Sequence, residues 1–222
     1  MDYAKEIVFL GELHDQCLAA DRAFTRIKWA IQLHAKPQSE RQRQLADPQL
    51  DAFVHDAVCT FLDACAIVSK LLKPAPARRD PDRAARAEAR GAELLRNIGV
   101  SEDAEFMPRD VRDAVEHIDE RLDEWMASGN RPFPETWVII WPGEPGSWEP
   151  VDGLRTFDAR SMEVSVLGSR CNIEGMHEGL VRLDQRLNVS TSDLSFSVTE
   201  PGKPPNSISI RMATGRKPPN EG

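Results

Sequence analysis

An arginine, a carboxylate and a histidine lie close together in one short stretch, and their types could do chemistry. Arg112 and Asp113 are adjacent, and four residues separate the arginine from His117. An arginine offers a fixed positive charge and a fork of donors for phosphoryl oxygens, whereas a histidine can carry a proton near neutral pH. Asp113 and His117 are four positions apart, so on a helix the carboxylate can orient the imidazole. The three residues therefore indicate a site that acts on a phosphate group.

The spacing also limits what one copy of the chain can do. On a single helix Arg112 and His117 lie about 140° apart, so they do not converge on one substrate. Two copies that meet across a dimer axis would bring both types of side chain together. The alternative interpretation is a solvated helix face that carries a histidine without a role, because both residue types are common on such faces.

One amphipathic helix is expected to position these side chains. Pro108 suits the first position of a helix, where its missing N–H costs nothing. Apolar residues then recur with the spacing of a single stripe, at Val111, Ala114, Val115, Ile118, Leu122 and Trp125. The pattern predicts a continuous helix over 108–126 with its ionisable residues on the opposite side.

The segment Arg112-Asp113-x-x-Glu116-His117, late in a predicted set of long helices, resembles the HEPN superfamily. The hallmark of that family is an arginine, a polar residue, and a histidine four to six residues after the arginine. The resemblance spans about residues 1–130. It implies a helical homodimer in which two motifs face each other in one cleft and cleave RNA without a metal.

The resemblance also implies roles for individual residues. His117 would act as the general acid or base, Arg112 would stabilise charge on the phosphoryl oxygens, and Asp113 would position the pair. Arg109 and Glu116, on the same helix, are the candidate substrate-binding residues. The setting implied is a bacterial toxin–antitoxin or antiphage defence system, with an antitoxin or another protein as partner.

Charge favours a different class of function. The chain has 222 residues, a formal net charge of −8 and a pI near 5.2, which argues against a general nucleic-acid coat. Carboxylates around the motif, such as Glu120 and Asp123, would repel RNA phosphates. The alternative function is a non-catalytic dimerisation or protein-interaction module with a seam of ion pairs of the Arg112–Glu116 type. A third reading is a ligand pocket in the bundle lined by Arg109 and Arg112.

The sequence predicts neither a metal nor a cofactor. His55 and Cys59 share a helical face, but two ligands do not make a zinc site. The cysteines lack metal-ligand spacing and read as small buried hydrophobes of a reducing compartment. No apolar stretch approaches the length expected of a membrane span. We expect a soluble, cytoplasmic protein with no membrane contact.

Hydrophobic periodicity predicts about four helices in an up-and-down bundle. The other three helices are expected over 3–33, 47–72 and 83–98, with a polar loop over 36–46. The helix over 47–72 has the widest apolar face, so it should either be the most buried helix or also meet a second subunit. Arg86 and Arg90, four apart on the helix over 83–98, could meet an acidic partner or a phosphate, although a solvated, salt-bridged face is the simpler reading.

A small sheet is expected after the bundle, which makes the fold class mainly α within α+β. Extended segments are predicted at 137–141, 154–157, 162–167 and 170–173. Gly168-Ser169 suits a hairpin turn, and a last helix is expected over 176–187. Three tryptophans of this region could stack on bases, although tryptophan in a small sheet is more often core; they are Trp137, Trp141 and Trp148.

These elements divide the chain into four predicted parts. Residues 1–130 form the helical bundle, and 131–190 form a small α/β appendage packed on it. Residues 191–213 are expected to hold a hairpin. The Pro-, Gly- and charge-rich end, 214–222, is expected to be disordered.

Overall fold

The computed structural model describes residues 3–44, 47–74, 80–101, 106–128, 137–143 and 155–192. Within these ranges the chain is mainly helical, with a small mixed sheet and a C-terminal helix, which confirms the predicted α+β class. The expected hairpin over 191–213, the expected tail over 214–222 and Trp148 lie outside the described residues, apart from the end of the last helix.

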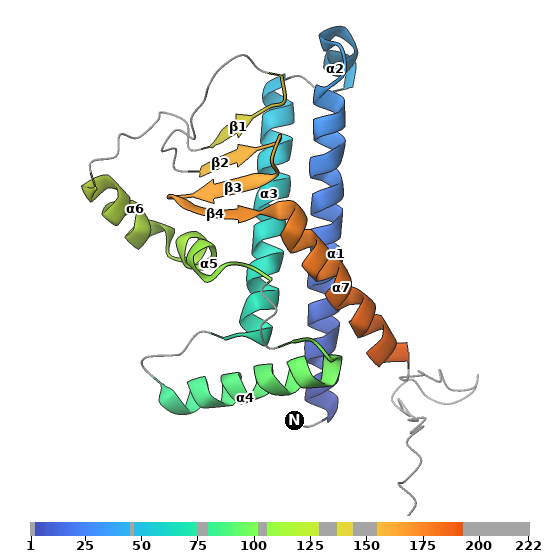
Figure 1. The fold of residues 1–222 in the computed structure, drawn as a ribbon, viewed down its shortest axis with the longest axis vertical. Coiled ribbons are helices and arrows are strands. Elements are labelled where there is room, and N and C mark those ends of the chain that lie inside the picture. The colour runs from blue at the N-terminus through green and yellow to red at the C-terminus, as the bar shows by residue number, and fades with distance from the viewer. Residues whose placement is uncertain are drawn as a thin grey trace, which may run out of the picture.

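Two long antiparallel helices form the spine of the molecule (Figure 1). They are α1 (Tyr3–His34) and α3 (Asp47–Leu72). On the buried face of α1, Ala20, Ala23 and Ala30 are fully buried, and such short side chains let two helices approach closely. Across from them Phe61 of α3 is also fully buried. Helix α1 continues through Gly11 without interruption.

The connector between these helices is not the plain loop that the sequence predicted. It contains a short helix, α2 (Gln38–Gln44). The backbone N–H groups of Glu40 and Arg41 donate to the carbonyl of Pro37, and Lys36 pairs with Glu40 at 2.9 Å. A charge run of this kind is therefore compatible with a solvated helical turn as well as with a loop, because exposed lysine–glutamate pairs support helices.

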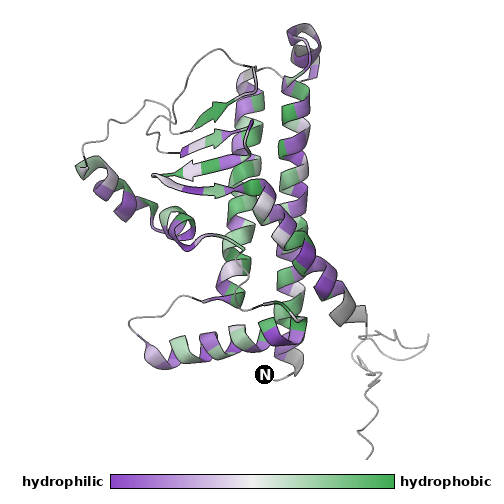
Figure 2. Ribbon diagram, viewed as in Figure 1, coloured by the Kyte–Doolittle hydropathy of each residue, from purple (hydrophilic) through white to green (hydrophobic). Residues whose placement is uncertain are grey.

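Much of the apolar surface of α3 is buried inside the molecule. Among the described residues, one helical segment, Pro48–Leu72, has the length and hydropathy of a membrane span, and 56% of its most apolar window is buried. Its fully buried residues are Val54, Ala57, Val58, Phe61, Cys65 and Val68. Figure 2 shows hydrophobic residues along α3, on which α1, the sheet and α4 converge. The expectation that no apolar stretch is long enough for a membrane span is therefore wrong for this helix, although more than half of its most apolar window is buried in the molecule.

Helix α4 (Pro81–Ile98) crosses the end of the α1–α3 pair instead of running alongside it (Figure 1). Its start follows the predicted signal, since the carboxylate of Asp80 accepts the backbone N–H of Arg83 at 2.9 Å. Gly99 ends the helix in the left-handed region at φ 72°. Gly91 is the point of closest approach, where a built Cβ would lie 2.4 Å from the carbonyl oxygen of Leu72.

Four strands form one mixed sheet in the order β1-β2-β3-β4. The strands are β1 (Val138–Ile140), β2 (Arg155–Asp158), β3 (Glu163–Val166) and β4 (Ser169–Asn172). Strand β1 is parallel to β2, and the other neighbours are antiparallel. The β3–β4 turn lies one residue earlier than predicted, because Leu167 and Gly168 have φ of 50° and 86° and Val166 pairs with Ser169. Two positive φ values suit a tight hairpin turn.

Helix α7 (Ile173–Ser192) follows β4 directly and crosses α1 (Figure 1). The side chain of Asn172 accepts the backbone N–H of Gly175, which caps the start of the helix earlier than the predicted residue 176. Two histidine–aspartate pairs join α7 to α1: His14 with Asp184 at 2.7 Å, and His177 with Asp21 at 2.9 Å.

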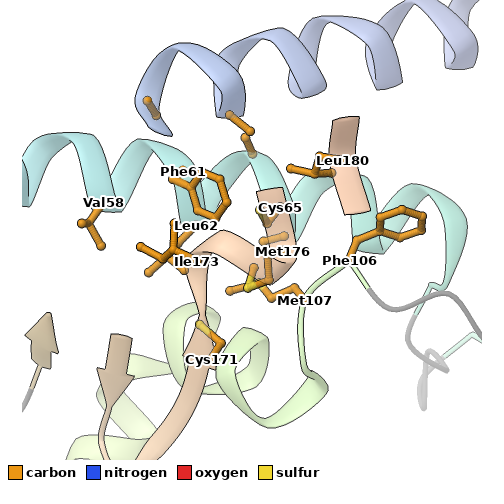
Figure 3. Close-up of a cluster of buried hydrophobic side chains, with 14 of the residues drawn as sticks. Val58, Phe61, Leu62, Cys65, Phe106, Met107, Cys171, Ile173, Met176 and Leu180 are labelled. Carbon is orange, nitrogen blue, oxygen red and sulfur yellow. The ribbon is translucent and has the colours of Figure 1, made fainter. Parts of the chain in front are cut away.

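The predicted bundle and appendage share one hydrophobic cluster. In Figure 3, Phe61 and Cys65 of α3 lie beside Ile173, Met176 and Leu180 of α7. The same cluster takes in residues that precede α5 and residues of the sheet, among them Phe106, Met107 and Cys171. Segments far apart in sequence therefore support each other through a continuous core.

Candidate functional site

The stretch that carries Arg112, Asp113 and His117 forms two helices instead of the single one predicted. Helix α5 (Arg109–Glu116) ends at His117, and α6 (Ile118–Ala127) begins immediately after it. His117 has φ −118° and ψ 44°, outside the helical region. The stretch contains no proline or glycine after Pro108, so neither of these residues causes the break. The predicted apolar stripe still faces the interior, since Val111, Ala114 and Trp125 are buried.

Arg112 holds α5 against the C-terminal end of α3. Its Nη1 donates to Ser69 Oγ at 3.1 Å and to the Lys73 carbonyl at 3.3 Å. The side chain is only 5% exposed. The last carbonyls of a helix lack partners within the helix, and a guanidinium is well suited to satisfy them. The guanidinium therefore performs a structural task that the sequence analysis did not foresee.

Asp113 faces the arginines instead of the histidine. Its carboxylate lies 3.7 Å from Arg109 Nε and 4.0 Å from Arg112 Nε. The link to His117 is through the backbone, where the histidine N–H donates to the Asp113 carbonyl at 3.0 Å. No side-chain hydrogen bond joins Asp113 to His117 in the part of the chain that the structure describes. The break at His117 removes the helical spacing on which the expected pair depended.

The other residues of the predicted site are dispersed. His117 is exposed at the α5–α6 junction. The side chain of Arg109 is 69% exposed, and Glu116 pairs with Lys70 of α3 at 2.9 Å. None of Arg109, Glu116 and His117 lines either of the two hollows described below. The fold therefore leaves the side chain of His117 exposed to solvent and buries that of Arg112.

A hollow of about 320 Å³ lies next to this stretch, between α6 and the β3–β4 turn. Its lining residues are Ala114, Arg121, Glu124, Trp125, Ser128, Leu167, Gly168 and Ser169. Neither Arg109 nor Arg112 lines it, so it is not the pocket that the ligand-binding reading predicted. Arg121 and Glu124 pair with each other at its edge at 3.2 Å.

The two tryptophans of this set that the structure describes, Trp137 and Trp141, do not form an open stacking platform. Trp141 is 5% exposed, its Nε1 donates to Asp51 at 2.9 Å, and its ring stacks on His34 with centroids 4.3 Å apart. Trp137 is partly buried beside His55, with the Arg155 guanidinium 5.8 Å from its ring centroid. Both rings are occupied by neighbours from the protein, as in the core reading of the sequence.

The described residues contain no group of three or more metal-ligating side chains. The four cysteines are free thiols. Burial raises the pKa of the Cys17 and Cys171 thiols to about 12, and it raises the pKa of Cys65 well above its usual range. These three thiols stay protonated at neutral pH, so they are poor nucleophiles and poor metal ligands. The prediction of small buried cysteines is confirmed for these three, whereas Cys59 is only partly buried.

Comparison with known proteins adds no independent assignment. No family model, no curated protein and no solved structure matches the chain.

The sequence analysis missed one feature that the fold assembles. Lys5 and Phe9 of α1 lie beside Arg83, Arg86 and Arg90 of α4, around a hollow of about 530 Å³. The sequence shows only the spacing of Arg86 and Arg90, because about 80 residues separate α4 from the start of α1. No pattern within a short stretch of sequence indicates that the start of α1 and α4 meet around this hollow.

Proposed function

We propose that this chain is a non-catalytic, HEPN-like interaction module that self-associates. The observation that carries the proposal is the burial of Arg112. A guanidinium that stabilises a transition state must reach the phosphoryl oxygens of a bound substrate. The Arg112 guanidinium is instead held by Ser69 and Lys73 at the end of α3.

The charge of α6 supports the same conclusion. Its carboxylates Asp119, Glu120, Asp123 and Glu124 are exposed, and they outnumber the single cation, Arg121. Arg121 is already paired with Glu124. A helix with this surface repels the phosphates of RNA at the position where His117 would have to meet them.

The free thiols agree with a reducing compartment, and we place the protein in the cytoplasm.

Exposed apolar residues indicate where a second copy would bind. The described part of the chain has five exposed large hydrophobic residues, and four of them lie on α1 and α3. Val8, Leu18 and Trp29 share one stripe of α1, and Ile67 lies on α3. Two copies that pair through this face would bury that surface and form a four-helix arrangement of two α1–α3 pairs.

The self-association is tested by sedimentation equilibrium. We expect the native protein to have twice the 24.9 kDa mass of one chain. Replacement of Leu18 and Trp29 by glutamate places charges in the apolar face, so it should produce a monomer. The matched control is Met126→Glu on α6, where the side chain is 45% exposed. This variant should remain a dimer.

Two results would contradict this part of the proposal. A native protein that stays monomeric at about 100 μM would exclude a dimer of physiological strength. Dissociation caused by Met126→Glu, with no effect of the α1 substitutions, would move the interface to α6. Circular dichroism of each variant separates loss of association from loss of folding.

A metal-independent endoribonuclease is the second candidate function. The observation that favours it is the exposed imidazole of His117, which lies at a break between two helices and is open to a substrate. In that case His117 would transfer the proton, Arg112 and Asp113 would complete the catalytic group, and Arg109 and Glu116 would contact the RNA. The biological setting would be a toxin–antitoxin or antiphage system, with an antitoxin as partner.

A further inference from the structure

A basic hollow lies between the first turns of α1 and residues 83–93 of α4. It has a volume of about 530 Å³, within the range of sites for small molecules. Its lining residues are Lys5, Phe9, Arg83, Arg86, Ala87, Ala89, Arg90 and Glu93. Four cations therefore face one carboxylate, although the whole chain has a formal net charge of −8.

These cations are not neutralised by neighbours in the part of the chain that the structure describes. No ion pair there involves the side chains of Lys5, Arg83 or Arg86. The Arg90 guanidinium lies over the ring of Phe9, 4.8 Å from its centroid. The Nε atom of Arg90 is buried and has no hydrogen-bond acceptor among the described residues. A buried donor without an acceptor is costly, and a ligand oxygen would remove that cost.

Helix stability does not explain this arrangement. Arg83 lies in the first turn of α4, where the helix dipole disfavours positive charge, and Arg86 follows in the second turn. Arg83, Arg86 and Arg90 fall within roughly 60° of one another around the helix axis. Ala87 and Ala89 also line the hollow, and their short side chains leave open space between α4 and α1. The sequence thus places cations together at an unfavourable end of a helix, around an open space.

The carboxylates around the hollow are too few or otherwise occupied. Glu93 lines it, and Glu6 accepts a hydrogen bond from Asn97 at 2.6 Å. Asp80 caps α4 through the backbone N–H of Arg83. Asp82 and Glu88 are exposed on α4 and do not line the hollow. An excess of positive charge therefore remains inside it.

We propose that this hollow binds a small oligophosphate anion. Several guanidinium groups on one face match the several oxygens of linked phosphates, because each arginine presents a planar fork of donors. A single phosphate or sulfate would engage only part of the set. The inference is independent of the proposed self-association, since none of the hollow's residues belongs to the apolar stripe of α1.

Isothermal titration calorimetry with inorganic tripolyphosphate tests the proposal on the full chain. We expect one binding site whose affinity falls as the salt concentration rises. Arg86→Gln should weaken the binding by at least about tenfold, because it removes charge-assisted hydrogen bonds. Arg96→Gln is the matched control: it lies on the same helix, makes the same change in charge and is outside the hollow. It should bind like the wild type.

Three outcomes would overturn the proposal. The first is no heat of binding with the wild type. The second is an equal loss of affinity in Arg86→Gln and Arg96→Gln, which would indicate a general effect of net charge. The third is sulfate binding as tight as that of tripolyphosphate, which would reject the oligophosphate class. Arg83→Gln provides a second variant with the expected loss if Arg86→Gln fails to fold.

Discussion

Arg112→Ala is expected to lower the free energy of unfolding by about 2–4 kcal/mol, because a buried charged donor is lost together with its packing. The substitution leaves the Lys73 carbonyl and the Ser69 hydroxyl without the guanidinium that now contacts them at 3.3 and 3.1 Å. It also opens space beneath α5, since the side chain is only 5% exposed. Urea denaturation followed by circular dichroism measures the change.

Arg109→Ala is the control for this prediction. Arg109 is three residues earlier on the same helix, its side chain is 69% exposed, and its pair with Asp113 spans 3.7 Å. Exposed pairs of this kind contribute little, so the change should stay within about 0.5 kcal/mol. If both substitutions have equally small effects, Arg112 is not a structural residue. The argument against its catalytic role would then fail.

Gly91→Ala is expected to destabilise the protein by about 1–3 kcal/mol, the usual range for overpacking. This is opposite to the usual effect of alanine in a helix, which gains about 0.5–1 kcal/mol over glycine. A Cβ at residue 91 would lie 2.4 Å from the Leu72 carbonyl oxygen and 3.1 Å from Pro74 Cδ. A backbone atom cannot move aside as a flexible side chain can, so α4 would have to shift away from α3.

Gly11→Ala is the matched substitution in an open position. Gly11 also lies inside a helix, but a Cβ there would meet nothing within 4 Å. We expect thermal unfolding to show a higher midpoint for Gly11→Ala and a lower one for Gly91→Ala. A rise in both midpoints would mean that α4 does not approach α3 as closely as described.

The helices could be predicted from the sequence because their signals are local. Periodic apolar residues mark α1 and α3, and Asp80 followed by a proline marks the start of α4. The β3–β4 hairpin followed from a glycine between two extended segments, although the turn is displaced by one residue. The short helix α2 was missed because its sequence is polar and carries no apolar stripe.

The geometry of the candidate site could not be predicted, because it depends on residues far apart in sequence. The partners of Arg112 are Ser69 of α3 and Lys73 just after that helix, about 40 positions earlier in the sequence. No residue near His117 indicates the break there; it separates α5, which Arg112 anchors to α3, from α6, which carries the buried Trp125. The spacing of the motif is visible in the sequence. Tertiary packing determines that Arg112 is buried and that His117 is exposed.

The stretch that carries Arg112 and His117 is proposed not to cleave RNA, and a cleavage assay with EDTA present tests this most directly. Structured and single-stranded RNAs would be incubated with the wild type, with His117→Ala and with a mock purification. The account predicts the same background degradation in all three. Cleavage by the wild type that His117→Ala abolishes, leaving 2′,3′-cyclic phosphate ends, would contradict the account and establish the endoribonuclease.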